Sequence, residues 1–259
     1  MVTTTTILAD FVRAVAGPDV NVRSIVPVGA SVETYEPTPQ DIAAVHDARL
    51  LVENGAGLET WLSRLINNAK APALLTVVAT TSDSVVAHNP HEWMDPQRAR
   101  GYVRRICRGL IAVDPTHAER YRANARRYDA ELVALTLSVR AQIATIPPAR
   151  RVMLVYHDAW RYYDARFGLR TAGVIEPAPG REPSATALGE LVDAAREAKV
   201  SVVFSEPEES SRLAQALASS LPSGRVVPLS VDTLGDEPGV RSYLGLVRHD
   251  TAAIVAALK

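Results

Sequence analysis

One long run of helical periodicity in the middle of the chain constrains this fold most. The run begins at Asp114-Pro115, a helix cap followed by a proline, and it ends at Pro147-Pro148. Apolar residues recur along it at intervals of three and four: Tyr121, Ala125, Tyr128, Leu132, Leu135, Val139, Ile143 and Ile146. This spacing predicts a single helix of about 45–50 Å, at about 1.5 Å per residue. A helix of that length favours a rigid bracket between two separate lobes.

On both sides of this helix, short β-branched runs alternate with helical patterns. The expected strands lie at 21–28, 48–55, 73–78, 151–158, 200–207 and 224–232. Such alternation is typical of parallel sheets. We therefore predict an α/β fold of two lobes, each with a mainly parallel sheet and flanking helices, joined by one long rigid helix. The expected divisions are 1–113 (N-terminal α/β lobe), 114–147 (linking helix) and 148–259 (C-terminal α/β lobe).

The start of one helix, within residues 36–48, is well specified. Thr38 can cap it, Pro39 suits the first helical position, and Asp41 completes a capping box. Further helices are expected at 59–70, 159–168, 185–198 and 210–221.

Charge and cysteine content limit the partners and sites that this chain can have. The net charge of −1 gives no electrostatic argument for a nucleic-acid or anionic-membrane partner. Cys107 is the only cysteine, which excludes an internal disulfide and a thiolate metal cluster. Any metal site must therefore use imidazole and carboxylate. The first residues lack a basic segment followed by an apolar one, so composition alone favours a cytosolic protein over a mature secreted domain.

Two histidines occupy positions that suit a binding site. His91 lies in NPHEWMDP, residues 89–96, where two prolines hold the backbone in a defined turn. His157 follows an apolar run and precedes a helical pattern, so it is expected at the carboxyl end of a parallel strand, where open α/β folds place their sites. Position alone leaves open whether His157 is a ligand or a core histidine bonded to a carbonyl. The other histidines are weaker candidates: His46, His117 and His249 are expected at the surface, and His88 lies in a polar loop.

Acidic residues share these strand-end positions. Asp232 and Glu206 end apolar runs of the second half, and Glu33 and Glu36 lie in the loop after a run of the first half. Side chains from both lobes are therefore expected to face one crevice. Two imidazoles with one or two carboxylates suit a divalent first-row metal. A hydrolytic site would also need an open coordination position and a general base, and the sequence has no HExxH-like signature.

Four ordered motifs, spanning nearly the whole chain, resemble the metal-binding solute-binding proteins of bacterial ABC transporters of the zinc and manganese type. The motifs are residues 7–62, NPHEWMDP at 89–96, VYHDAWRYYDARFGL at 155–169, and residues 176–207. The long linking helix agrees with the rigid helix of that family. The resemblance implies a protein that captures a metal ion in the cleft between its lobes.

The resemblance implies four side-chain ligands, which are Glu33, His91, His157 and Asp232. Glu33 departs from the family pattern, in which histidine is usual at that position. The resulting set of two nitrogens and two carboxylates is familiar in manganese-type members. The implied cargo is a divalent ion, zinc or manganese, with ferrous iron as a further candidate. The segment before His91 also lacks the histidine-rich insertion that some zinc members carry.

Neighbouring side chains are expected to support these ligands. We expect Glu36 and Glu206 to be structural or to orient the imidazoles. Trp93 and Trp160 are expected to pack in the core or between the lobes.

The resemblance also implies a biological setting. The chain would be a monomeric binding protein rather than an enzyme, deliver its ion to a membrane permease, and bind no nucleic acid. Such proteins are periplasmic or lipid-anchored at the cell surface, which overrides the compositional preference for the cytosol; a leader, now absent, would have preceded residue 1. Two alternatives would use the same cleft: a zinc-dependent hydrolase and a binding protein for a metal chelate or small organic ligand.

Overall fold

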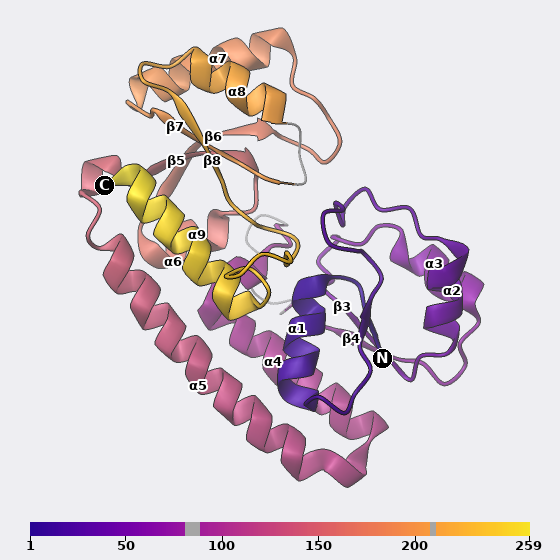
Figure 1. The fold of residues 1–259 in the computed structure, drawn as a ribbon. Coiled ribbons are helices and arrows are strands. Elements are labelled where there is room, and N and C mark those ends of the chain that lie inside the picture. The colour runs from indigo at the N-terminus through magenta and orange to yellow at the C-terminus, as the bar shows by residue number, and fades with distance from the viewer. Residues whose placement is uncertain (81–88, 208–210) are drawn as a thin grey trace.

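The structure is a computed structural model that describes residues 1–80, 89–207 and 211–259. It contains two separate four-stranded sheets, one in each half of the chain (Figure 1). The first has the order β2-β1-β3-β4, built from β1 (Val2–Thr3), β2 (Arg23–Ser24), β3 (Leu50–Glu53) and β4 (Leu75–Val78). The second has the order β6-β5-β7-β8, built from β5 (Val152–His157), β6 (Arg170–Glu176), β7 (Val202–Ser205) and β8 (Arg225–Pro228).

All strand pairs in both sheets are parallel, which confirms the predicted α/β fold class. Because the strands are parallel, their carboxyl ends all lie along the same edge of each sheet. His157 is the last residue of β5 and pairs in register with Glu176, the last residue of β6. Glu206 directly follows β7. The second sheet therefore carries several polar side chains along one edge.

Helices cover both sheets. In the first half these are α1 (Thr6–Ala16), α2 (Pro39–His46), α3 (Leu62–Ala69) and α4 (Pro96–Val113). The second half has α6 (Arg161–Phe167), α7 (Ala185–Glu197), α8 (Ser211–Ser219) and α9 (Tyr243–Leu258). The capping box of α2 forms as predicted, because Asp41 accepts hydrogen bonds from the backbone N–H and hydroxyl of Thr38 at 2.8 and 2.7 Å. None of the helices in the described ranges is both long and apolar enough to cross a membrane.

The long helix is shorter than its sequence pattern. A 3₁₀ turn occupies Pro115–His117, and α5 spans Ala118–Ile143, which is about 39 Å. Asp114 does not cap the helix; its carboxylate instead accepts hydrogen bonds from Tyr121 Oη and His117 Nδ1. The predicted apolar stripe does face the interior, since six of its members are buried within α5: Tyr121, Tyr128, Leu132, Leu135, Val139 and Ile143.

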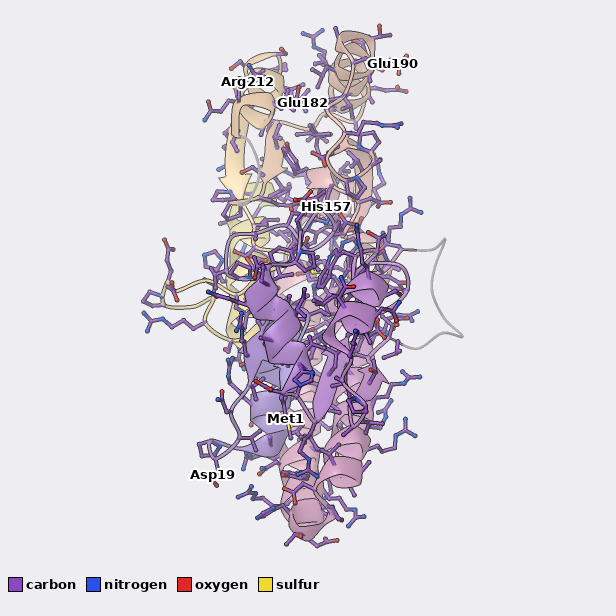
Figure 2. The ribbon with its side chains drawn as sticks, turned by 90° about the vertical axis from the view of Figure 1, so that its right-hand side faces the viewer. Met1, Asp19, His157, Glu182, Glu190 and Arg212 are labelled. Atoms are coloured by element: carbon purple, nitrogen blue, oxygen red, sulfur yellow. The ribbon has the colours of Figure 1, made fainter. Side chains whose placement is uncertain are left out.

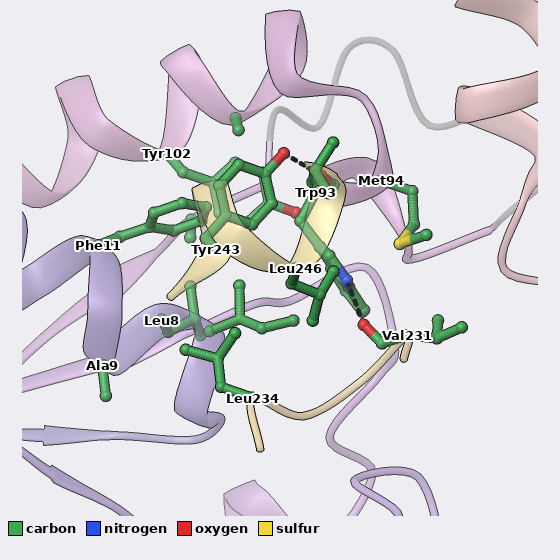
Figure 3. Packing of buried hydrophobic residues seen from close by; sticks show 14 of the residues in the cluster. Leu8, Ala9, Phe11, Trp93, Met94, Tyr102, Val231, Leu234, Tyr243 and Leu246 are labelled. Atoms are coloured by element: carbon green, nitrogen blue, oxygen red, sulfur yellow. Dashed lines mark hydrogen bonds between the residues drawn. The ribbon is translucent and has the colours of Figure 1, made fainter. Parts of the chain in front are cut away.

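The helices α1, α4, α5 and α9 form a common base on which both sheets rest (Figure 1). Phe11 of α1 lies at its centre, with its ring centroid 4.7 Å from that of Tyr243 of α9 and 5.8 Å from that of Tyr102 of α4 (Figure 3). The ring of Tyr128 of α5 is 6.1 Å from Phe11. The main hydrophobic core therefore includes residues from both halves of the chain. This shared core fixes how the two sheets, and the polar edges they carry, face each other.

Candidate metal centre

Three of the four predicted ligands converge on one point. His91, His157 and Asp232 each offer a ligand atom, and these atoms all lie within 4.8 Å of one another. The two Nε2 atoms are 3.2 Å apart. The Oδ1 atom of Asp232 lies 3.8 Å from His91 Nε2 and 4.0 Å from His157 Nε2. All three residues are shielded from solvent, His91 and Asp232 almost completely.

The NPHEWMDP segment directs His91 into this point. It forms a 3₁₀ turn, Glu92–Met94, and then Asp95 caps α4 by accepting a hydrogen bond from the Gln97 N–H at 2.9 Å. Trp93 is buried, as expected, and its indole N–H donates to the carbonyl of Val231 at 3.1 Å (Figure 3). Because Val231 precedes Asp232, this bond fixes one candidate ligand relative to another.

Asn89 sets the tautomer of His91. Its Oδ1 atom accepts hydrogen bonds from the backbone N–H of His91 at 3.1 Å and from His91 Nδ1 at 3.0 Å. Its amide nitrogen donates to the carbonyl of Asp158, the residue after His157. With Nδ1 as the donor, His91 presents the lone pair of Nε2 to the cluster. Sequence reasoning missed this residue, although an Asn two positions before the bonded N–H is a recognisable turn pattern.

Glu206 performs the same task for His157, as the sequence suggested. Both of its carboxylate oxygens lie close to His157 Nδ1, at 2.7 and 2.8 Å. A carboxylate that accepts from the outer ring nitrogen orients the imidazole and increases the basicity of the other nitrogen. His157 therefore also directs Nε2 toward His91 and Asp232.

The two histidines have opposite electrostatic environments. Burial, reinforced by the nearby His157, holds the pKa of His91 well below the ordinary value. Burial alone would also lower the pKa of His157, but the carboxylates of Glu206, Asp232 and Glu33 raise it to about 10. At neutral pH a charged His157 can therefore donate its Nε2–H to the neutral His91 across 3.2 Å.

The spacing of the three groups suits a bound cation. An ion about 2.1 Å from each Nε2 would see the two nitrogens at an angle of about 100°, between the octahedral and tetrahedral values. The carboxylate of Asp232 would need to approach by only a few tenths of an ångström. The donor set of two imidazoles and a carboxylate matches the preferences of divalent first-row metals.

Glu33 lies beside this cluster but is not part of it. It lines the same cavity of about 220 Å³, together with His91, His157 and Glu176. Burial raises the pKa of the Glu33 carboxyl, while the charge of His157 lowers it and the carboxylates of Glu206 and Glu176 raise it. Glu33 is thus close enough to interact electrostatically with the site.

The remaining candidates lie elsewhere. Glu36 is exposed and lines a different cavity, beside Tyr35 and Trp61, so of its two expected roles, structural or orienting an imidazole, the second was wrong. Glu36 lies three positions before Pro39, the first residue of α2. The three histidines expected at the surface, His46, His117 and His249, are exposed there. His88 lies outside the described residues.

The comparisons with known proteins agree with this geometry. The family described as "ZnuA: Zinc-uptake complex component A periplasmic" matches residues 1–257. The chain belongs to this family. The manganese-binding lipoprotein MntA of Halalkalibacterium halodurans is 30% identical over 266 residues, covering 100% of this chain and 88% of that protein. The iron-binding protein YfeA of Yersinia pestis is 30% identical over 255 residues, covering 95% and 82% of the two chains.

A solved structure extends the similarity to three dimensions. The periplasmic zinc-binding protein TroA of Treponema pallidum superposes with a TM-score of 0.90 at 25% identity, covering 99% of this chain and 98% of that one. Further relatives are named as substrate-binding lipoproteins of manganese or metal ABC transporters. The family thus consists of substrate-binding transport proteins that work outside the cytoplasm, and not of enzymes.

Proposed function

We propose that this chain captures a divalent transition-metal ion in the cleft between its two sheets and delivers it to the membrane permease of an ABC transporter. The observation that carries the proposal is the convergence of His91, His157 and Asp232, with the outer nitrogen of each imidazole already committed to a fixed partner. Two Nε2 atoms preorganised in this way favour a metal over an organic ligand, once the ion displaces the proton of His157. The relatives named for manganese, iron and zinc support the same reading.

We assign Glu33 as the fourth ligand. It faces the cavity from the N-terminal half of the chain, as His91 does, and a modest movement of its loop would bring a carboxylate to the cluster. Two carboxylates would balance the charge of the dication, and each can bind through one or both oxygens. The chain would act as a monomer, because the grouped site residues all come from one copy. It would be periplasmic or lipid-anchored, as the names of the family and of its relatives suggest.

The donor set suits manganese or ferrous iron as the physiological ion, although zinc should bind more tightly in vitro. Replacing Glu33 by His would create three imidazoles and one carboxylate. Competition between zinc and manganese should then shift toward zinc about tenfold or more, or about 1.4 kcal/mol. An unchanged ratio would mean that Glu33 does not touch the ion.

Native mass spectrometry tests the proposal as a whole. The purified protein should carry the mass of one bare ion, and His91→Ala or His157→Ala should remove it. His46→Ala is the matched control, since His46 is exposed and its Nδ1 lies 2.8 Å from the carbonyl of Ala69. A bound organic mass, or full metal occupancy in both site variants, would refute the proposal.

A further inference from the structure

Positive charge is concentrated in one part of this nearly neutral chain. Residues 96–127 contain nine arginines, no lysine and two acidic residues, whereas the whole chain has a net charge of −1. These residues form α4, the 3₁₀ turn and the first part of α5. The two helices pack against each other as a hairpin that extends beyond the first sheet (Figure 1). The low net charge therefore conceals a strongly basic surface.

The arginines of this hairpin line an exposed groove. Arg104, Cys107 and Arg108 from α4 face Arg122, Ala125 and Arg126 from α5 around a cavity of about 370 Å³. All four arginines are exposed, whereas Cys107 is buried and Ala125 partly so. The groove thus combines a cationic rim with a floor of small, weakly polar side chains. We call this surface the arginine groove.

The protein neutralises this charge only in part. Arg100 makes a two-point ion pair with Asp129, at 2.7 and 2.8 Å. Arg104 is 3.9 Å from the same carboxylate, and Arg122 pairs with Glu119 one turn away. Within the described residues, Arg108 and Arg126 have no carboxylate within 4.0 Å. Gathering like charges raises the free energy of the surface, and an external anion would lower it.

We propose that the arginine groove binds an anionic phospholipid surface, with headgroup phosphates seated between α4 and α5. Guanidinium groups match phosphate oxygens in two-point hydrogen bonds, which makes arginine better suited than lysine to this task. The small, weakly polar side chains of the floor leave room for the glycerol and first methylenes of a lipid. The inference rests on the proposed extracytoplasmic function, which would keep the protein beside a membrane.

The contact would leave the metal cleft accessible. Arg104 lies eight residues along α4 from Pro96, or about 12 Å from the turn that carries His91. Lipid binding would therefore hold the protein at the membrane through its helical base, while the cleft stays clear of the lipid.

Vesicle sedimentation tests this proposal. The protein should bind vesicles that contain phosphatidylglycerol but not vesicles of pure phosphatidylcholine, and salt should weaken the binding. The combined variant Arg104→Gln, Arg108→Gln, Arg122→Gln and Arg126→Gln should bind about a hundredfold or more weakly. The control replaces four other exposed arginines by Gln and changes the net charge equally: Arg64, Arg196, Arg212 and Arg241. Arg212 lies at the end of the molecule away from the tip of the α4–α5 hairpin (Figure 2).

The outcomes are separable. Equal loss of binding in the groove and control variants would show a general charge effect and overturn the proposal. Release by inorganic phosphate at constant ionic strength would reassign the groove to small anions. No binding to anionic vesicles at low salt would also overturn it and leave an acidic protein as the partner. Native mass spectrometry of the same groove variant should show undiminished metal binding, so failure of the metal proposal would be seen independently of vesicle binding.

Discussion

His91 and His157 present the same ring nitrogen to the site, but their second nitrogens have different partners. A neutral amide oxygen, from Asn89, accepts from His91, and a carboxylate, from Glu206, accepts from His157. Burial and the nearby His157 keep His91 neutral, whereas the carboxylates of Glu206, Asp232 and Glu33 keep His157 charged at neutral pH. Replacing Asn89 and replacing Glu206 should therefore affect metal binding differently.

Asn89 should be a positioning residue. Asn89→Ala removes the acceptor for His91 Nδ1 and should weaken metal binding about ten- to a hundredfold. Asn89→Asp keeps an oxygen acceptor and should retain most of the affinity. Both can be measured by competition with a chelating dye, with the exposed Asn68→Ala as control. Wild-type affinity in Asn89→Ala would mean that the bond does not orient the ligand.

Metal binding should release a proton from His157. An ordinary imidazole loses its proton near pH 6.5, but His157 has a raised pKa of about 10 and stays charged above neutrality. A cation must displace that proton, so affinity should rise about tenfold per pH unit between about 7 and 9. Calorimetry in buffers of different ionisation enthalpy should count about one proton per ion.

The same raised pKa affects the metal-free fold. The charged pair of His157 and Glu206 contributes its full stability below about pH 6.5, and this contribution is lost as the pH rises toward about 10. Glu206→Gln should reduce the stability that is lost at high pH, and it should also reduce the number of protons released when the ion binds. An affinity that is constant from pH 7 to 9 would contradict this assignment of charge.

At the residue scale, the sequence was informative where local chemistry fixes a side chain. The prolines and the Asp95-Pro96 helix start made the direction of His91 predictable. The role of Asn89 depends on a tight turn over three residues, and a closer reading of that turn could have found it. The position of Glu36 could not be predicted from the sequence. It depends on the tertiary packing of its loop, in which the neighbouring Tyr35 ring packs against Trp61.

Among the elements, α5 was the most predictable and the short strands were the least. Its stripe of three- and four-residue intervals is a strong signal even where the helix ends differ from the pattern. In contrast, β1 is two residues long and β6 contains Gly173, whose close contact with Leu191 and Leu154 leaves no room for a side chain. Both strands were missed, because neighbouring strands rather than local preference define them.

Two leucines on α5 test whether its buried apolar face stabilises the packing of α1, α4, α5 and α9. Leu132 is fully buried, so Leu132→Ala should lower the free energy of unfolding by about 2–5 kcal/mol. Leu137 is 59% exposed on the same helix, and Leu137→Ala should change it by less than about 0.5 kcal/mol. Urea denaturation would measure both. Similar losses in the two variants would contradict the predicted burial of one face.

Across the whole molecule, direct bonds link the two halves around the cleft. Arg166 of α6 donates to Asp95 at 2.8 Å, and the backbone N–H of Leu234 donates to Thr6 Oγ1 at 2.8 Å. The Tyr243 N–H donates to Asp10 at 2.9 Å. Together with the shared aromatic core, these bonds oppose a wide hinge motion. The long helix α5 made this rigidity predictable from the sequence. The packing of α9 was not predictable, because it depends on contacts between residues more than two hundred positions apart, such as Tyr243 and Asp10.

Metal binding should therefore change the shape of the protein little. We expect small-angle scattering curves with and without metal to superpose closely, because only loops such as that of Glu33 need to move. A marked decrease in the radius of gyration on binding would contradict the rigid base and indicate closure of whole lobes.

In the proposed complex, one metal ion lies between His91, His157, Asp232 and Glu33. Anomalous X-ray diffraction from crystals grown with manganese, recorded on both sides of the absorption edge of the metal, tests it most directly. We expect a single strong peak about 2.1–2.3 Å from both Nε2 atoms, with carboxylate oxygens of Asp232 and Glu33 completing the coordination. A peak that these two imidazoles do not coordinate, or none in protein shown to carry one ion, would contradict it.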